Sequence, residues 1–535
     1  MLQRIQCLYR DFAEAEATRR RVEDVQLDRL QRQAAGRTSR RAFLQAAGVA
    51  AAAALGAPAP LFAASAPRIA IVGGGIAGLN AALTLLDAGY ASTVYEASSR
   101  IGGRMHSDTT SWENGQVTEH CGEMIDAGHK TILKLAQRLD IPAVNLSSAE
   151  PPRSVDTYHF FGQYYSRTQA NSDFKPVFEA VKQDLKAADY PTLYNDYTPG
   201  ALALDRTSVR EWIARRVPGG LSSPMGRLLD VAYTVEYGGE TDTQSSLNLI
   251  YMLGFQSGGS FRLFGELNDQ YRLTGGNDKL PAAIAEALPR GSIQLGTQLT
   301  SIAKNADGTY ALNFAQGSKN LAVTADRVIL ALPFSVLRNL DYKDAGFSEV
   351  KVAGIRQLGY ATNVKLHLQF QGRPWDQPGP WGNGNGTSFS DMGYQSTWDG
   401  TRAQPGSTGI LVHYTGGDVG ASYVGDPSEP SVVEAHARDF LNQIEAVYPG
   451  LSTQWGGRAT LDVPARNPYL LGSYSYWKVG QYTLFGGSEG ERSGKCHFAG
   501  EHCSRDFQGL MEGGAQEGAR AANEILNDYK SGIVP

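Results

Sequence analysis

Residues 68–104 read RIAIVGGGIAGLNAALTLLDAGYASTVYEASSRIGGR, and this segment gives the clearest indication of the fold. Ile69–Val72 is a continuous apolar run, which is typical of a strand buried in a parallel sheet. Gly73, Gly75 and Gly78 follow at the spacing G-x-G-x-x-G. Glycines at this spacing allow a tight turn, a close approach of the backbone to a pyrophosphate, and close packing of a helix on the strand.

The residues after the glycines complete a dinucleotide-binding pattern. Ala77–Leu86 has the apolar spacing of a helix, whose first amides would face the phosphates. Residues 93–95 read as a second strand that ends in Glu96, where a carboxylate can accept hydrogen bonds from a ribose diol. Glycine-rich turns are common in a chain with 61 glycines. The order strand, turn, helix, strand, acid is much more specific, and it predicts a Rossmann-type domain.

Length and charge limit the class of protein. A chain of 535 residues is long enough for two domains or more. Met1–Ala66 holds ten of the 49 basic residues but only six of the 54 acidic ones. The remaining chain is therefore acidic, which argues against nucleic acid as a partner.

The first 66 residues resemble an export signal. Arg40 and Arg41 lie in SRRAFLQAAG, and no charged residue follows until after Pro67. This pattern resembles a bacterial twin-arginine signal, which implies recognition by the Tat translocase and delivery of a folded protein to the periplasm or beyond. The alternative, a transmembrane anchor, is disfavoured by the prolines and by the low content of Leu, Ile and Phe.

Three cysteines follow the leader: Cys121, Cys496 and Cys503. They form no Cys-x-x-Cys pair and accompany no histidine cluster, so we expect free thiols and no metal site.

A second motif lies near the C-terminus. Residues 496–499 read as a strand ending in Gly500 and Glu501, and Gly509–Asn527 reads as a helix with small residues on one face. Together with the opening motif, this segment resembles the C-terminal signature of the flavin-containing amine oxidase family. That family includes monoamine, polyamine and L-amino acid oxidases.

The resemblance implies noncovalent FAD as the cofactor. By this resemblance, Arg104 would contact the pyrophosphate of FAD and Leu299 would contact the adenine. Glu501 would bind the ribityl chain, and the Met511 amide would face the flavin pyrimidine. Ser473 stands where monoamine oxidases carry the cysteine that bonds to FAD. The full predicted set of FAD contacts is Gly73, Gly75, Ile76, Ala77, Gly78, Glu96, Ala97, Gly103, Arg104, Gly122, Glu123, Met124, Leu299, Gly500, Glu501, Leu510 and Met511.

The resemblance also implies the domain organisation. We expect an α/β fold in which a Rossmann-type FAD-binding domain is interleaved with an α+β substrate-binding domain. The predicted FAD-binding segments are 67–128, 271–342 and 457–530, and the predicted substrate-binding segments are 129–270 and 343–456. The active site should lie where the two domains meet, and a homodimer is possible for this family.

Lys365 is the first predicted catalytic residue. In TNVKLHLQF it alternates with apolar residues, and on this pattern alone it is a solvated lysine on a strand. The resemblance implies instead the family lysine that binds a water at flavin N5, since Trp375 follows in an Arg-Pro-Trp turn.

Tyr474 is the second predicted catalytic residue, because it matches a tyrosine of the family's aromatic substrate cage. The second cage aromatic is replaced by Leu510, with Phe507 the nearest substitute. Trp477 and Tyr482 fit either the cage or the core.

Glu123 is the third predicted catalytic residue, and its charge bears on which substrate the site binds. L-amino acid oxidases of the family place an arginine for the substrate carboxylate in a Gly-x-Met-Arg pattern. This chain has Met124 at that place, with Glu123 and Asp126 beside it. These acids predict a cationic substrate, a polyamine or a basic L-amino acid. The alternative is that Glu123 only bonds the backbone around the flavin.

The predicted reaction is oxidation of an amine C–N bond to an imine, which water hydrolyses to an aldehyde or keto acid and ammonia or an amine. Molecular oxygen would be reduced to H2O2. Two alternatives remain: an L-amino acid oxidase for neutral amino acids, and a non-catalytic flavoprotein scaffold.

Overall fold

Strand β1 (Ile69–Val72) lies at the centre of a five-stranded parallel sheet. The structure is a computed structural model that describes residues 67–256, 261–265 and 267–532. The order in the sheet is β23-β13-β1-β2-β9, in which only β1 and β2 are consecutive in the chain. The other strands are β2 (Thr93–Tyr95), β9 (Ile293–Gln294), β13 (Arg327–Leu330) and β23 (Cys496–Phe498).

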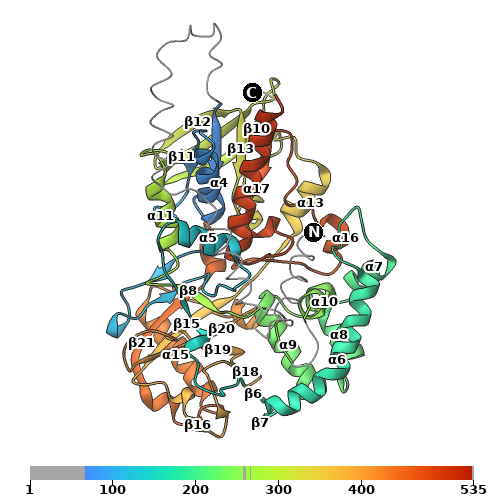
Figure 1. The fold of residues 1–535 in the computed structure, drawn as a ribbon, viewed down its shortest axis with the longest axis vertical. Coiled ribbons are helices and arrows are strands. Elements are labelled where there is room, and N and C mark those ends of the chain that lie inside the picture. Colours follow the sequence, from blue (N-terminus) through green and yellow to red (C-terminus); the bar gives the residue numbers. More distant parts are fainter. Residues whose placement is uncertain (1–66, 257–260, 266, 533–535) are drawn as a thin grey trace, which may run out of the picture. The chain divides into compact units, whose positions relative to one another are not determined.

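Helices α4 (Ile76–Asp87) and α17 (Met511–Lys530) pack against each other on the parallel sheet (Figure 1). They come from opposite ends of the described chain. The contact is close because Gly518 faces the backbone of Ala77, where a Cβ would lie 2.0 Å from the carbonyl oxygen. The sequence predicts both helices, and both are confirmed to within three residues at each end.

The parallel-sheet lobe, defined as the elements around this sheet, includes a second sheet and four shorter helices. The second sheet is antiparallel, in the order β10-β11-β12. Its strands are β10 (Thr297–Lys304), β11 (Tyr310–Gln316) and β12 (Lys319–Ala325), and the helices are α5 (Lys130–Arg138), α11 (Lys279–Ala287), α12 (Phe334–Leu337) and α13 (Glu349–Gln357).

A seven-stranded mixed sheet forms the base of the other lobe, in the order β21-β15-β20-β19-β18-β6-β7. All seven residues of β15 are buried, because the strand pairs on both edges and helix α15 packs against it. The strands are β6 (Thr157–Phe160), β7 (Gln163–Tyr164), β15 (Val364–Phe370), β18 (Ser388–Ser390), β19 (Ser396–Asp399), β20 (Gly409–Thr415) and β21 (Trp455–Asp462), and α15 spans Pro430–Ile444.

Five helices complete this mixed-sheet lobe (Figure 1). Ser208 caps α8 through a capping box, and Ser223 with Pro224 starts α9. The helices are α6 (Arg167–Ala188), α7 (Pro199–Asp205), α8 (Val209–Arg216), α9 (Pro224–Tyr237) and α10 (Ser246–Gly254).

The chain passes between the two lobes several times, as the predicted interleaved α/β fold requires. Three predicted assignments need correction. Helices α5 and α13, predicted to lie in the substrate-binding segments 129–270 and 343–456, pack in the parallel-sheet lobe. The sequence pattern assigns residues 457–462 to the FAD-binding domain, but they belong to β21, which pairs with β15 in the mixed sheet. The wrong boundary arises because an edge strand with several exposed residues has no continuous apolar run to reveal it.

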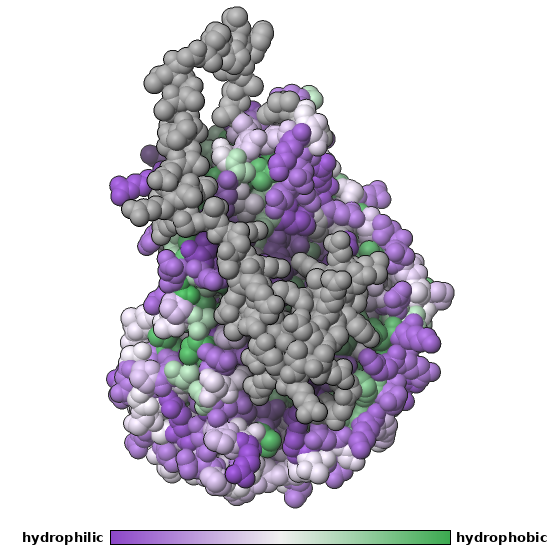
Figure 2. Space-filling view, in the orientation of Figure 1, coloured by the Kyte–Doolittle hydropathy of each residue, from purple (hydrophilic) through white to green (hydrophobic). Residues whose placement is uncertain are grey.

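The surface of the described residues is mainly polar. In Figure 2, hydrophilic residues cover most of the visible described surface, and hydrophobic residues form small separate patches. Within the described residues, no helix combines the length and the apolarity needed to cross a membrane. The predicted export signal lies in residues 1–66, outside the described part of the chain.

Candidate active site

The turn after β1 forms an open cradle at the N-terminus of α4. Gly73 has a φ of +110°, and a Cβ on Gly78 would lie 2.0 Å from the Gly73 carbonyl oxygen, so neither position accepts a side chain. Gly75, the N-cap, differs: a Cβ there would meet no atom within 4 Å. No side chain of the described chain caps α4, and its first turn holds no acid. Ile76 and Ala77 begin the helix, so its terminus is open to a phosphate group.

Glu96 ends β2 beside this cradle. Its carboxylate accepts hydrogen bonds from the backbone amides of Gly74, at 2.7 Å, and Ser98, at 2.8 Å. These bonds fix the carboxylate at the turn, with Ala97 as the next residue along the chain. The arrangement fits a ribose that binds next to the pyrophosphate.

Arg104 and Glu501 form an ion pair that joins distant segments. The Arg104 Nη1 donates to Glu501 Oε1 at 2.8 Å and to the Ser473 carbonyl at 3.0 Å. Glu501 also accepts bonds from the Ser475 amide and hydroxyl and from the Gly509 amide. Burial alone would raise the pKa of Glu501, but the charge of Arg104 and these hydrogen bonds outweigh burial and leave the pKa below its usual value.

The loop that contains Glu123 lies against the start of α17. A Cβ on Gly122 would lie 2.9 Å from the Met511 side chain, and the Gly122 amide donates to the Arg104 carbonyl at 2.9 Å. Helix α17 has Leu510 as its N-cap and, among the described residues, no side-chain cap. Such an uncapped terminus stabilises nearby negative charge.

The other predicted cofactor residues occupy the same lobe. Gly103 has a φ of +56° and would place a Cβ 3.3 Å from the Gly75 Cα. Leu299 is buried in β10, and Gly500 connects β23 to Glu501. Met124 follows Glu123 and is half-buried.

Lys365 is buried in β15 and paired with Glu123. Its Nζ donates to Glu123 Oε2 at 2.7 Å and to the Glu119 carbonyl at 3.1 Å, and it lies 5.4 Å from the centre of the Trp398 ring. Only 6% of Lys365 is exposed, so the interpretation of a solvated lysine, which the alternating pattern alone favours, is wrong.

The two acids predicted to attract a cationic substrate already have partners. Glu123 bonds Lys365, accepts from Trp398 Nε1 at 3.3 Å and lies 3.9 Å from Arg272 Nη1. Asp126 Oδ1 accepts from two successive backbone amides, at 3.0 and 2.8 Å. Lys365 therefore offsets the charge of Glu123, which weakens the prediction that this acid attracts a cationic substrate, whereas the backbone amides carry no charge to offset that of Asp126.

Tyr474 belongs to a row of aromatic side chains. Its hydroxyl lies 3.0 Å from the Tyr414 hydroxyl, and the Tyr414 ring packs 5.2 Å from the ring of Trp398. Gly509 lies against the Tyr474 ring, where a Cβ would be 3.3 Å away, so the row begins just before α17. It ends at Trp398, which contacts both Glu123 and Lys365.

Two other aromatic candidates are in the core. Trp477 is buried and stacks on Tyr482 at 4.6 Å, and both pack in the hydrophobic core that includes Phe485. The resemblance leaves these two residues open, and the structure favours the core assignment.

Sequence reasoning misses Trp398, Tyr414 and Glu236. Tyr414 is the direct register partner of Lys365 on β20, and Trp398 lies on the next strand. No sequence pattern shows that residues 409–415 pair with the strand that contains Lys365. Glu236 could have been noticed as an acid in the last turn of a mostly apolar helix, a position at which basic residues are favoured.

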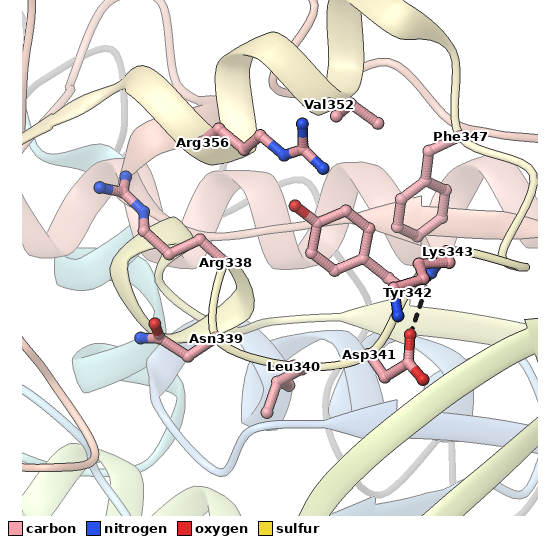
Figure 3. A pocket seen from close by; sticks show the side chains of 9 residues that line it. All are labelled: Arg338, Asn339, Leu340, Asp341, Tyr342, Lys343, Phe347, Val352 and Arg356. Atoms are coloured by element: carbon pink, nitrogen blue, oxygen red, sulfur yellow. Dashed lines mark hydrogen bonds between the residues drawn. The ribbon is translucent and has the colours of Figure 1, made fainter.

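A separate surface pocket of about 590 Å³ lies beside α12 and α13 (Figure 3). None of the predicted site residues lines it. Its lining residues are Arg338, Asn339, Leu340, Asp341, Tyr342, Lys343, Phe347, Val352 and Arg356. In the described part of the chain, no group of three or more His, Cys, Asp or Glu residues is arranged to hold a metal ion, and Cys121, Cys496 and Cys503 are free.

Comparison with known proteins agrees with this geometry. Residues 76–526 match the family model described as flavin containing amine oxidoreductase. The L-amino-acid oxidase of Siganus canaliculatus is 25% identical over 493 residues, covering 86% of this chain and 85% of the relative. The L-amino-acid oxidase of Mus musculus is 24% identical over 496 residues, covering 87% of this chain and 72% of the relative.

The fold is also similar to a solved structure. Cyclohexylamine oxidase from Brevibacterium oxydans superposes with a TM-score of 0.72 at 20% identity. The superposition covers 87% of this chain and 100% of the cyclohexylamine oxidase chain. Because the family model spans most of the sequence, this chain belongs to the family of flavin containing amine oxidoreductases.

Proposed function

We propose that this protein is an FAD-dependent oxidase of amine C–N bonds. The observation that carries the proposal is the buried Lys365, held beside the aromatic row Trp398–Tyr414–Tyr474, which reaches the start of α17. Family membership supports the use of a flavin. The open position at Gly75, the bonded Glu96 carboxylate and the uncapped start of α17 fit FAD.

FAD, when bound, supplies the oxidant that accepts a hydride equivalent from the carbon next to the nitrogen. The residues of this chain have other tasks. An alkylamine has a pKa of about 10.4, like that of lysine, yet it must react in its neutral form. The rings of Trp398, Tyr414 and Tyr474 provide a surface of low polarity that favours the neutral amine.

Lys365 positions a water molecule. Its ammonium has three N–H donors, of which two bind Glu123 and the Glu119 carbonyl. The third donor is left for a water at the flavin edge. Glu123 holds the ammonium in place, and Trp398 covers it, so the pair excludes bulk solvent from this side of the site.

The proposed reaction removes two hydrogens from the amine, one from the nitrogen and one from the neighbouring carbon, and leaves an imine. Molecular oxygen takes up the two electrons and two protons and becomes H2O2. Water then converts the imine into a carbonyl compound and ammonia, or into a carbonyl compound and an amine when the nitrogen is substituted.

We propose that the substrate is cationic, a polyamine or a basic L-amino acid. The alternative is a neutral amino acid, which the names of the relatives favour.

Anaerobic mixing tests the proposal. Purified holoenzyme is mixed with a panel of monoamines, diamines and L-amino acids while the flavin absorbance is followed. Bleaching by at least one class, followed by H2O2 formation when air is admitted, is the expected result. A flavin that stays oxidised with every compound would favour a non-catalytic scaffold instead.

We also propose that FAD binds without a covalent bond. Ser473, at the family's attachment position, donates its hydroxyl to Asn363 Oδ1 at 2.7 Å and has no thiol to bond the flavin. Acid precipitation should leave the yellow colour in the supernatant, and a coloured washed pellet would contradict this.

Export through the Tat translocase to the periplasm or beyond is proposed from Arg40 and Arg41. Replacing both with lysine should retain the protein in the cytoplasmic fraction, and unchanged fractionation would overturn the proposal. A homodimer is proposed from the resemblance, and sedimentation of purified protein tests it.

A further inference from the structure

Glu236 occupies an unusual position in the proposed site. It lies in the last turn of α9, which ends at Gly238 with a φ of +60°. Its backbone carbonyl accepts a hydrogen bond from the Tyr474 hydroxyl at 2.5 Å, which places the Glu236 backbone at the Tyr474 end of the aromatic row. The side chain is half-buried, and its carboxylate forms no hydrogen bond or ion pair with any residue that the structure describes.

The charges that act on Glu236 are all negative. Burial, together with the charges of Asp269 and Asp126, raises the pKa of the Glu236 carboxyl to about 8. Glu123 is neutralised by Lys365, and the Oδ1 oxygen of Asp126 is occupied by two backbone amides. A half-buried carboxylate among other acids and without a cation is destabilising, and a bound ammonium would relieve that cost.

The aromatic groups beside Glu236 suit an ammonium. Tyr474 bonds the Glu236 carbonyl, the Tyr414 hydroxyl lies beside that of Tyr474, and Tyr237 is the next residue of α9. Aromatic faces next to a carboxylate attract organic cations by cation–π and charge interactions.

The order of contacts gives the two ends of a substrate. Lys365 and Glu123 lie at the Trp398 end of the aromatic row, and Glu236 lies at the Tyr474 end. A substrate that spans the row can therefore place a second charged group several bonds away from the reacting nitrogen.

We propose that Glu236 is the specificity-determining residue that binds a second, protonated amine of the substrate, in a diamine, a polyamine or a basic amino acid. This inference rests on the proposed amine oxidase function and deepens it. It assigns the preference for cations to a residue different from Glu123 and Asp126.

The test compares substrates matched in length. Holoenzyme is assayed with 1,4-diaminobutane against butylamine, and with L-lysine against L-norleucine. The first pair detects a diamine site and the second a basic amino acid site. We expect a preference of at least tenfold in kcat/KM for the dication of one pair.

Glu236→Gln removes the charge and keeps the shape. In this variant the preferred dication should lose at least tenfold in kcat/KM, mainly through KM, while its neutral analogue changes less than twofold. Glu240→Gln is the matched control. Glu240 follows shortly in the chain, but its carboxylate accepts a bond from the Asp418 amide and lies outside the aromatic row, so the preference should be retained.

Inhibition by a compound that carries two positive charges gives a second readout of the Glu236 charge. Inhibition of the oxidation of the neutral analogue by a bis-quaternary diammonium compound should weaken at least tenfold in Glu236→Gln. In the wild type this inhibition should strengthen as pH rises through about 8, because the carboxylate becomes charged.

The outcomes separate the two proposals. If neutral amines are oxidised but neither dication is preferred, or if Glu236→Gln affects both members of a pair equally, this inference is overturned and the amine oxidase function stands. If no amine or amino acid reduces the flavin, the proposed function itself fails, and the assignment of Glu236 fails with it.

Discussion

The glutamate carboxylates of the parallel-sheet lobe differ in their bonding from those near the aromatic row. In the parallel-sheet lobe, Glu96 accepts hydrogen bonds from two backbone amides, and Glu501 accepts hydrogen bonds from Arg104 and Ser475. Near the aromatic row, Lys365 and Glu123 neutralise each other, whereas the Glu236 carboxylate has no partner among the described residues. The same residue type is thus fully bonded in one region and unpaired in the other.

The nucleotide cradle is formed before its ligand binds, whereas the site at Glu236 is completed only by its ligand. The carboxylates of the nucleotide cradle are fixed in advance, so binding FAD requires little reorganisation. An unpaired acid instead makes the protein less stable until a cation binds. Unpaired groups of this kind are typical of specificity-determining positions, because they penalise a ligand that lacks the matching charge.

The largest expected effect is loss of the bound cofactor, and it concerns two glycines of the nucleotide cradle. Gly78→Ala forces a Cβ to within 2.0 Å of the Gly73 carbonyl and should destabilise the fold by at least about 1–3 kcal/mol, with loss of FAD. Gly75→Ala meets no protein atom, so the fold should survive while the flavin content falls sharply. Urea unfolding and the ratio of flavin to protein absorbance measure the two effects.

Gly128→Ala is the control for both variants, because a Cβ there also meets no atom within 4 Å and the residue lies outside the cradle. Full flavin content in Gly75→Ala would contradict the assignment of the cradle.

The next effect concerns the buried ion pair. Lys365→Met should slow flavin reduction by an order of magnitude or more, and it should cost about 3–5 kcal/mol of stability because Glu123 is left as an uncompensated charge. The double variant Lys365→Met/Glu123→Gln should recover most of the stability but not the rate. Stopped-flow reduction and denaturant unfolding separate the two roles, and a normal rate in either variant would remove Lys365 from the mechanism.

A smaller effect concerns the support of the Glu123 loop. Asn277 is fully buried, and its Nδ2 donates to the carbonyls of Gly122 and Glu123 at 3.0 and 2.7 Å. Asn277→Ala should cost about 1–3 kcal/mol through unsatisfied carbonyls and should lower the rate of flavin reduction. Unchanged reduction with reduced stability would limit Asn277 to a structural role.

The smallest expected effect is a pH dependence of stability caused by Glu236. Its pKa is raised in the folded protein to about 8, whereas the unfolded chain ionises near the ordinary value of 4.5. Between these values the unfolded state has lost a proton that the folded state keeps, so stability falls as pH rises from about 4.5 to about 8. Glu236→Gln should unfold with a shallower pH dependence in this window, measured by thermal denaturation without ligand. An identical pH profile would show that the carboxyl is solvated.

Local sequence patterns were enough to predict the elements of the nucleotide cradle and the segments that flank it. The glycine spacing, Glu96 and the helices predicted at 77–86 and 509–527 follow from such patterns, since each depends on residues close together in the chain. The structure places these helices at Ile76–Asp87 and Met511–Lys530. Resemblance to the family added Arg104 and Glu501, and the structure brings these two residues into contact.

Which charges are free could be learned only from the folded chain. Lys365 and Glu123 are 242 positions apart, and Tyr474 reaches Glu236 across 238, so no local pattern could show that Glu123 is neutralised and that Glu236 is not. The side of β15 that the alternating pattern assigns to solvent is buried, because the segment that contains Glu119 and Glu123 lies against Lys365. Local patterns fix turns and helices, whereas the balance of buried charge depends on contacts between segments that only packing brings together.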